Sequence, residues 1–375
     1  MAMKLPEIKI PSLKFLHGKD LIGVDIGTHS IKVVQLKGSS KKWSLFKWGI
    51  APISSDGKEL SPQESIDVQT ATLKSLLAQT GIKTKNAAAS ISGNSVIVRY
   101  VKFPKLSAQE LEKTIQYEAE PYIPFDIRDV NIGFNILNDI TEDGQKKMET
   151  ILVAAKKEVV QSRIDVLQMA GLSPMIIDVD AFAIENAFEQ SRTPESNDTV
   201  LFINIGAAVT NMSIIENGVS KVVRDVFVAG NSFSKALQKN LQCDFQEAEN
   251  LKSQFGLLVS AEEKEQALSE DRKDALQIST LIGPIARDLL GEVQRSLDFY
   301  LSQGSDRAVN KVLLSGGSSK IKNLDKYFAQ ELRLPVELFN PMAQIAGGDK
   351  VPPDDVMSLT VALGIATRRV GDSRT

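Results

Sequence analysis

The stretch LIGVDIGTHSIKVVQL, residues 21–36, decides the fold predicted for this chain. Two runs of apolar and largely β-branched residues flank the short segment 27–30, which begins with a glycine. This pattern is typical of a β-hairpin with a tight connection. The first run is almost wholly apolar, as in a strand buried on both faces, yet Asp25 lies near its end. A carboxylate in that position destabilises the fold unless a cation or a hydrated metal ion pairs with it.

The residues around this predicted turn are those that a site for phosphate and magnesium needs. Gly27 lets the backbone pass close to a ligand, and Thr28 and Ser30 can donate hydroxyl hydrogen bonds. Lys32 can place a positive charge across the turn from Asp25. A single hairpin of this kind is commonly only a turn, so the interpretation depends on whether the pattern recurs.

The pattern does recur, in VLFINIGAAVTNMSIIEN at residues 200–217. A shift of 179 residues places Asn204 on Asp25, with apolar runs on both sides of the break. The same shift pairs Gly206 with Gly27, Ala207 with Thr28, and Asn211 with Lys32. Internal similarity at such a long spacing indicates two copies of one folding unit. The second copy keeps the glycine and carries Thr210, but asparagine stands where the first copy has its carboxylate.

Length and composition narrow the class of protein. The 375 residues predict two or three domains, and a hydrophobic content of 42% is enough for sizeable cores. A formal net charge of −3 provides no basic field for nucleic acid. The single cysteine, Cys243, excludes a disulfide framework and a cysteine metal cluster, and two histidines, His17 and His29, are too few for a histidine zinc site.

No apolar run reaches the ~18 residues of a membrane span, and residues 1–18 resemble a short tail rather than a signal peptide. We therefore expect a cytoplasmic protein.

Helix signals and strand-like runs alternate through the first half of the chain, which predicts a mixed α/β protein. Capping boxes at 61–64 and 107–110 open two helices, which are expected to end at Gly81 and near Pro121. Residues 101–171 are predicted to form an inserted module that contains a helix, a β-hairpin and a closing helix.

The second half contains a helical stretch and a glycine-rich connection. Residues 232–305 are predicted to be mostly helical, and Glu249 and Lys252 lie three positions apart on one helix face. By themselves, these two residues indicate no more than a surface ion pair. A buried strand runs into Ser-Gly-Gly-Ser-Ser at 315–319, a connection that can bring the backbone close to a nucleotide. A final apolar helix is expected over 357–369.

The order of these pieces resembles the actin-like ATPase superfamily, which includes actin, sugar kinases and DnaK-type chaperones. Three segments resemble its nucleotide motifs: GVDIGTHSIK (23–32) the first phosphate motif, NIGAAVTNM (204–212) the second, and LLSGGSSKIKNL (313–324) the adenosine motif. Two others, DVDAFAIENAF (178–188) and LTVALGIATRR (359–369), resemble the connecting helices. Within the superfamily, KFPKLSAQELEKTIQYEAEPYIPFD (102–126) followed by ILVAAKKEVVQSRIDVLQMAGLSPMIIDVD (151–180) resembles the PilM family, which is related to FtsA. The resemblance extends from residue 19 to residue 369.

The resemblance implies an actin-like ATPase fold, in which two duplicated ribonuclease-H-like domains enclose a cleft and a 1C-type subdomain is inserted. The implied divisions are a tail at 1–18, subdomain 1A at 19–100 and 172–198, subdomain 1C at 101–171, subdomain 2A at 199–231 and 301–354, subdomain 2B at 232–300, and a C-terminal helix at 355–375 that returns to 1A.

The resemblance also implies a function. PilM-like proteins are ATP-binding cytoplasmic scaffolds of the type IV pilus inner-membrane assembly platform, and they bind the N-terminal cytoplasmic tail of PilN. We expect the same of this chain, with ATP and Mg²⁺ as ligands and with attachment to the inner membrane through partner proteins. Other platform proteins, assembly ATPases and a second copy of the chain are further expected contacts.

Two alternatives belong to the same superfamily. An FtsA-like cell-division scaffold ends in an amphipathic membrane-binding helix, whereas residues 370–375 carry no apolar face. A small-molecule kinase needs a substrate pocket with a base carboxylate, whereas the insert here is a small module.

The resemblance assigns roles to residues by position. The expected nucleotide contacts are Gly27, Thr28, Ser30 and Lys32 in the first phosphate motif, Gly206, Ala207 and Thr210 in the second, and Glu249, Lys252, Gly316, Gly317 and Ser319 around the nucleoside. Asp25 would hold magnesium through water, since Mg²⁺ keeps several of its waters. Asp180 lies where the superfamily places a group that orients the attacking water. Asn204 departs from the usual aspartate, and because an amide adds no negative charge to hold Mg²⁺, we expect hydrolysis to be slow or absent.

The segment Tyr-Ile-Pro-Phe at residues 122–125 is the predicted contact with the partner protein. It is apolar, stiffened by proline, and lies outside any expected core strand. Tyr122, Ile123 and Phe125 would face the partner tail. The alternative is that these side chains seal the insert to the first domain.

Overall fold

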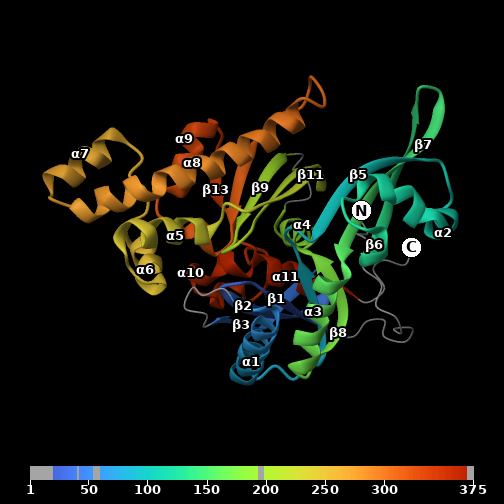
Figure 1. The fold of residues 1–375 in the computed structure, drawn as a ribbon, viewed down its shortest axis with the longest axis horizontal. Coiled ribbons are helices and arrows are strands. Elements are labelled where there is room, and N and C mark those ends of the chain that lie inside the picture. Colours follow the sequence, from blue (N-terminus) through green and yellow to red (C-terminus); the bar gives the residue numbers. More distant parts are fainter. Residues whose placement is uncertain (1–19, 40–41, 54–59, 193–197, 370–375) are drawn as a thin grey trace.

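The computed structural model describes residues 20–39, 42–53, 60–192 and 198–369, so the expected tail at 1–18 lies outside the described residues. Two five-stranded sheets and one three-stranded sheet organise the chain (Figure 1). The strands are β1 (Ile22–Ile26), β2 (Ser30–Ser39), β3 (Lys42–Pro52), β4 (Asn86–Ile91), β5 (Val96–Pro104), β6 (Val130–Glu142), β7 (Gln145–Lys156), β8 (Ser173–Val179), β9 (Thr199–Ile205), β10 (Thr210–Glu216), β11 (Val219–Val226), β12 (Lys311–Ser315) and β13 (Val336–Leu338).

The helices fall between these strands. They are α1 (Pro62–Thr80), α2 (Ala108–Ala119), α3 (Lys157–Met169), α4 (Asp180–Ser191), α5 (Gly230–Leu241), α6 (Phe245–Phe255), α7 (Ala261–Ser269), α8 (Lys273–Leu301), α9 (Leu324–Leu332), α10 (Pro353–Val356) and α11 (Thr360–Ala366). Both predicted capping boxes form, at Ser61 and at Ser107. The expected final helix is shorter than predicted, because a 3₁₀ turn at Met357–Leu359 precedes α11.

The two five-stranded sheets follow one plan, which confirms the internal repeat and the duplicated α/β fold. Their strand orders are β3-β2-β1-β4-β8 and β11-β10-β9-β12-β13. In each sheet an antiparallel three-stranded meander is followed by two parallel strands. The strands of the two hairpins also share a register, since Asp25 lies opposite Lys32 and Asn204 lies opposite Asn211.

The helices form layers outside and between the two sheets. Side chains from α1 and α3 pack with the first sheet, and those from α5, α8 and α9 pack with the second. Helices α4 and α11 occupy the space between the sheets, in a core that also includes Val34 of β2 and Phe202 of β9. The two halves of the chain, called here the first and second lobes, therefore share one buried layer.

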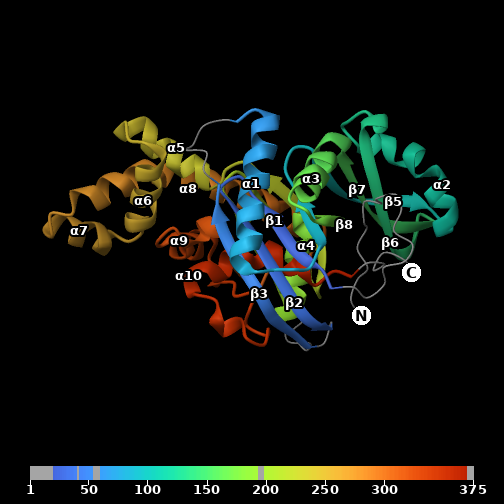
Figure 2. The same ribbon diagram turned by 90° about the horizontal axis from the view of Figure 1, so that it is seen from below.

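The three-stranded sheet, in the order β5-β7-β6, forms a separate module with α2 (Figure 1). This sheet begins at Val96 rather than at residue 101, because β5 pairs with β7 along its whole length. The expected closing helix of the module, α3, packs elsewhere, with its buried Val160 and Val166 in the core of the first lobe. Figure 2 shows the module at one end of the molecule and helices α6 and α7 at the other.

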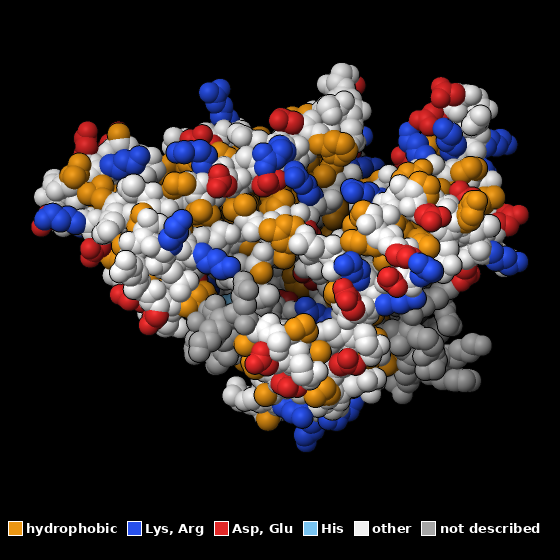
Figure 3. Space-filling model, viewed as in Figure 1, with side chains coloured by type: hydrophobic (Ala, Val, Ile, Leu, Met, Phe, Trp, Pro, Cys, Tyr) orange, Lys and Arg blue, Asp and Glu red, His pale blue; other side chains and the backbone are white. Residues whose placement is uncertain are grey.

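On the face shown in Figure 3, the described residues form no extended region of one charge. Figure 3 shows lysine and arginine side chains interspersed with aspartate and glutamate over the visible face, in keeping with the net charge of −3. Among the residues that the structure describes, we find no helix with the combined length and apolar character that a membrane crossing requires.

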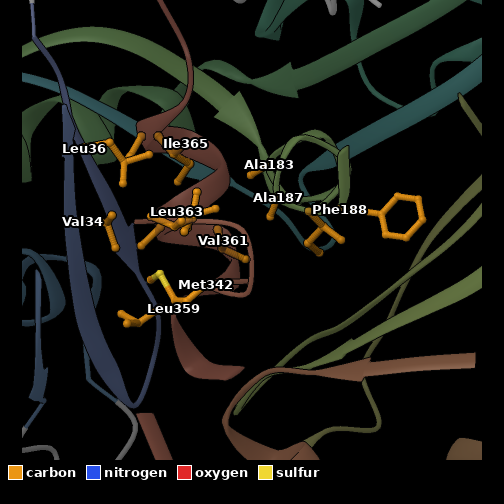
Figure 4. Close-up of a cluster of buried hydrophobic side chains, with 14 of the residues drawn as sticks. Val34, Leu36, Ala183, Ala187, Phe188, Met342, Leu359, Val361, Leu363 and Ile365 are labelled. Atoms are coloured by element: carbon orange, nitrogen blue, oxygen red, sulfur yellow. The ribbon is translucent and has the colours of Figure 1, made fainter. Parts of the chain in front are cut away.

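Two glycines allow α11 to pack unusually close to its neighbours. A Cβ atom on Gly364 would lie 1.7 Å from the carbonyl oxygen of Ala183 in α4. A Cβ atom on Gly23 of β1 would lie 2.1 Å from the carbonyl oxygen of Ala362 in α11. Figure 4 shows the result, with α11 side chains such as Leu363 between strand β2 and helix α4. Backbone-to-backbone contact therefore fixes α4 and β1 relative to each other.

Substitution Gly364→Ala is expected to lower the free energy of unfolding by about 3 kcal/mol or more, because the new methyl group meets backbone that has no room to move. Gly283→Ala in α8 is the matched control, since a Cβ atom there has no neighbour within 4 Å. The control is expected to change stability by less than about 1 kcal/mol and to increase it, since alanine favours helix. Urea denaturation of both variants checks this, and equal losses would contradict the packing argument.

A buried carboxylate lies where the insert and both lobes meet. Glu185 of α4 is 4% exposed and accepts hydrogen bonds from Ser220 of β11, through the backbone N–H at 3.3 Å and through the hydroxyl. Burial raises the pKa of Glu185 to about 7, which the bonds from Ser220 only partly offset. The hydroxyl of Tyr100, on β5 of the insert, is buried without a hydrogen-bond partner among the described residues, and burial and the charge of Glu185 raise its pKa. The three-way junction is thus most stable when Glu185 is protonated.

We expect the stability of the protein to fall as the pH rises from 4.5 to about 7, because Glu185 must release its proton while buried. The raised pKa corresponds to about 3 kcal/mol of folding stability that is lost above that window. Glu185→Gln keeps an acceptor for Ser220 and removes the titration. Its melting temperature should exceed that of the wild type at pH 8 and match it at pH 5, and an equal shift at both pH values would contradict the role of Glu185.

Candidate functional site

Both hairpin turns open into the same cavity, which lies between the lobes and has a volume of about 450 Å³. The first hairpin contributes Gly27, Thr28, His29 and Ser30, and the second contributes Gly206, Ala207, Ala208 and Val209. Each turn is closed by the same hydrogen bond, from the Gly27 N–H to the Ser30 carbonyl oxygen at 3.2 Å and from the Gly206 N–H to the Val209 carbonyl oxygen at 3.0 Å. The two similar stretches of sequence therefore form turns with the same hydrogen bond, and both turns border one cavity.

The two hairpins differ in charge at their matching positions. In the first, Lys32 Nζ lies 3.1 Å from Asp25 Oδ2 as an ion pair. In the second, the Asn204 amide donates to Asn211 Oδ1 at 3.0 Å. Both pairs border the cavity. We call each pair of side chains across the two strands of a hairpin a rung. The rung of the first lobe is an ion pair, and the rung of the second lobe is a pair of neutral amides.

The neutral rung continues into a hydrogen-bond chain that crosses between the lobes. Asn211 donates to Asp225 Oδ1 at 2.8 Å, and the backbone N–H of Gly93 in the first lobe donates to Asp225 Oδ2 at 2.7 Å. Burial raises the pKa of Asp225, and the two hydrogen bonds partly offset that rise. The second hairpin is therefore tied directly to the loop that follows β4.

Asp180 borders the same cavity at the first residue of α4. It accepts a hydrogen bond from the hydroxyl of Ser90, at the end of β4. Burial, together with the nearby charge of Asp25, raises the pKa of Asp180 to about 6, although the hydroxyls of Ser90 and Ser92 oppose the rise. A carboxyl group with this pKa exchanges a proton near neutral pH, which suits a group that orients or activates water.

The wall formed by α6 carries a buried cation. Lys252 is 6% exposed, and its Nζ lies 2.6 Å from Glu249 Oε1 and 2.9 Å from Ser234 Oγ. Burial lowers the pKa of Lys252, and the carboxylate of Glu249 opposes that shift. The interpretation of these residues as a simple surface ion pair is therefore wrong, because both border the cavity and the lysine is held inside it.

Several further residues border the cavity that the sequence analysis did not select. They are Ser90, Ser92, Arg163, Asn231, Ser318 and Lys320. His29 also reaches across to the second lobe, where its ring lies 6.1 Å from that of Phe245 on α6, and burial lowers its pKa. Arg163 belongs to none of the motifs identified in the sequence, since it lies inside the helix that was predicted to close the insert. Ser318 lies in the selected glycine motif, but its orientation depends on the 3₁₀ turn Gly317–Lys320.

Comparison with known proteins identifies the family. The profile of the family described as "Type IV pilus assembly protein PilM" matches residues 23–370. The chain belongs to this family. The match favours a role in pilus assembly over the alternatives of a division scaffold and a small-molecule kinase.

Two solved structures share the fold of this PilM family member. One is titled "PilM-PilN type IV pilus biogenesis complex"; it is 24% identical, has a TM-score of 0.78, and the match covers 95% of this chain and 99% of that chain. The other is the ethanolamine utilization protein EutJ from Carboxydothermus hydrogenoformans, with 16% identity, a TM-score of 0.52, and coverage of 96% and 91%. The actin-like fold expected from the sequence is thereby confirmed.

Two residues expected at the nucleotide do not face the cavity. Thr210 is fully buried and donates its hydroxyl to the Val228 carbonyl oxygen at 2.8 Å, so it supports the hairpin from behind. Ser319 is also buried and donates to the Gly316 carbonyl oxygen at 2.7 Å. Its neighbour Ser318 points to the other side of the turn and donates to the Gly206 carbonyl oxygen at 2.9 Å. Neither Thr210 nor Ser319 is among the residues that border the cavity, because both hydroxyls are buried and bonded to backbone carbonyl groups.

The predicted partner segment lies on the insert of this PilM family member, with its three side chains in different environments. Ile123 is 7% exposed and belongs to the core of the insert, so its side chain does not lie on the surface in this structure. Tyr122 is 41% exposed and packs edge-on against Phe103. Phe125 is partly buried against the same core, beneath the ammonium group of Lys156 at 5.2 Å. The segment therefore closes the insert upon itself rather than onto the first lobe, and Tyr122 remains accessible.

Proposed function

We propose that this PilM family member binds ATP with Mg²⁺ between its lobes and serves the pilus assembly platform as a nucleotide-dependent scaffold. The observation that carries the proposal is that two matching hairpin turns border one cavity of about 450 Å³, a volume within the usual range for small-ligand sites. Each turn offers backbone groups and a glycine, which is how proteins commonly hold phosphate groups.

The triphosphate would lie between the turns and the nucleoside against the second lobe. On the first side, Gly27, Thr28, Ser30 and Lys32 would contact phosphate oxygens, and Gly206 and Ala207 would contact them from the second. Glu249 and Lys252 would face the ribose or base, with Gly316 and Gly317 along the nucleoside. All ten of these residues border the cavity.

The donor atoms suit Mg²⁺ held mainly through water. Asp25 supplies a carboxylate that is 15% exposed, and the amide rung leaves the Asn204 carbonyl oxygen outside its own hydrogen bond. Such oxygen donors, few in number, match an ion that keeps several waters and also binds phosphate. Bound there, the ion would neutralise part of the phosphate charge.

Hydrolysis is proposed to be slow, with Asp180 as the water-orienting candidate. Phosphoryl transfer depends mainly on positioning and on stabilising charge. The neutral rung of Asn204 and Asn211 provides no second carboxylate for the metal, so less charge is available where the transition state needs it. A site with these neutral side chains suits a scaffold that holds ATP for long periods better than it suits a fast enzyme.

Binding of a fluorescent ATP analogue, titrated with and without Mg²⁺, tests the nucleotide site. Lys32→Ala is expected to weaken binding by about tenfold or more, because a charge-assisted phosphate contact is lost. Lys239→Ala, an exposed lysine on α5 outside the cavity, is the matched control and should bind as the wild type does. Equal affinity for all three proteins would overturn the proposed site, and single-turnover hydrolysis at ~1 s⁻¹ or faster would overturn the proposal of slow turnover.

The proposed partner is PilN, through its N-terminal cytoplasmic tail, which would also bring the protein to the inner membrane. The support is the family assignment together with aromatic side chains that stay exposed on the insert. Tyr122 is 41% exposed and Tyr117 on α2 is 83% exposed. Exposed aromatic side chains of this kind commonly anchor protein interfaces.

A peptide of the PilN tail should bind the wild-type protein and lose about tenfold or more in affinity with the double variant Tyr122→Ala/Phe125→Ala. Tyr122→Ala alone should give a smaller loss without disturbing the core of the insert. Phe299→Ala, a 58% exposed aromatic on α8 of the second lobe, is the matched control. Undiminished peptide binding by the folded double variant, as judged by circular dichroism, would reject this surface.

A further inference from the structure

We propose that Arg163 makes the site selective for nucleoside triphosphate over diphosphate by binding the terminal phosphate group. This inference rests on the proposed nucleotide function and extends it to a residue with no counterpart among the predicted contacts. Arg163 lies on α3 of the first lobe, and its side chain borders the cavity together with Asp25 and Asp180.

The guanidinium group is poorly satisfied by the residues around it. Its Nε is buried and has no hydrogen-bond partner among the described residues. Its Nη1 donates to Gln69 Oε1 at 3.5 Å, which is at the limit of hydrogen bonding. Unused donors on a partly buried cation are destabilising unless an anion pairs with them. The side chain therefore has donors to offer a ligand in the cavity.

The neighbouring carboxylates are already engaged. Asp25 forms its ion pair with Lys32 at 3.1 Å, and Asp180 accepts the hydroxyl of Ser90. Burial of Arg163 lowers its pKa, and the charges of Asp180 and Asp25 act against that shift. Arginine remains charged in proteins, and among the described residues Arg163 forms no direct ion pair, so this end of the cavity keeps a cation without a counter-ion in contact.

A phosphate group is the ligand chemistry that this arrangement fits. Arginine presents planar donors that match two phosphate oxygens at once, as lysine does not. The proposed nucleoside contacts Glu249, Lys252 and Gly317 border the cavity from the second lobe, whereas Arg163 borders it from the first lobe, together with Asp25 and Asp180. A diphosphate would leave the Arg163 end without its anion, and a triphosphate would supply it.

The position of Arg163 also connects the nucleotide to the insert. Helix α3 begins at Lys157, directly after β7 ends at Lys156, and β7 is the central strand of the insert sheet. A phosphate group bound by Arg163 would therefore restrain α3, the helix that connects the insert to the first lobe. Nucleotide state and the exposed surface of the insert would be linked through this one helix.

Isothermal titration of the full chain with ADP and with a non-hydrolysable ATP analogue, both with Mg²⁺, tests the inference. The wild type should prefer the triphosphate, and Arg163→Gln should weaken triphosphate binding by about tenfold while changing ADP binding by less than about threefold. Arg163→Lys distinguishes charge balance from phosphate binding, because lysine keeps the positive charge but lacks the planar pair of guanidinium donors. If Arg163 only balances the charges of Asp25 and Asp180, the lysine variant should keep the preference for triphosphate. If Arg163 binds the terminal phosphate, that variant should lose most of the preference.

Arg99→Gln, an exposed arginine on β5, is the matched control and should behave as the wild type. Equal losses for both nucleotides, or no change in the ratio of their affinities, would overturn the assignment of Arg163. Failure of the wild type to bind either nucleotide would overturn the proposed function itself, a different result. If Arg163→Gln unfolds at a much lower temperature than the wild type, the ratio of triphosphate to diphosphate affinity is taken from the folded Arg163→Lys variant. An unchanged ratio in that variant would contradict binding of the terminal phosphate by Arg163.

Discussion

The hydrogen bond from the Gly93 N–H to Asp225 is the constraint on which the site depends. It joins the loop after β4 to the second lobe, and Asp225 in turn holds Asn211, which pairs with Asn204. Because each member is buried or partly buried, a broken bond would leave a polar group unsatisfied. The network therefore ties the second hairpin to the loop after β4 in the first lobe, and the core that contains α4 and α11 also joins the two lobes.

The two hairpins share their geometry and differ in charge. Duplication placed Asp25 and Lys32 opposite each other in one lobe and Asn204 and Asn211 opposite each other in the other. The geometry is the same, but the second rung is neutral. A neutral rung preserves the shape of the cavity and its hydrogen bonds, and it withholds the negative charge that a catalytic metal site would use. The two hairpins of this family member thus have the same backbone shape but different charges at the matching positions.

Local sequence signals predicted the parts of the fold that depend on neighbours in the chain. The hairpin at 21–36, its copy at 200–217 and both capping boxes are read from residues that lie within a few positions of one another. The boundary of the insert was harder, because the pairing of β5 with β7 joins segments about 50 residues apart. Helix α3 has an apolar face that could cover either sheet, and only packing decides which one it covers.

The sequence by itself determined the duplication, the family and the turns that meet at the cavity, because these rest on short-range pattern and on motif order. Only the tertiary structure decided which side chains reach the cavity. Thr210, Ser319 and Ile123 turn into cores, while Ser318 and Arg163 face the cleft. The reason is physical: burial and hydrogen-bond partners are set by segments that are distant in sequence and adjacent in space. A residue's type shows what chemistry it can perform, and its neighbours across the fold decide whether it is placed to perform it.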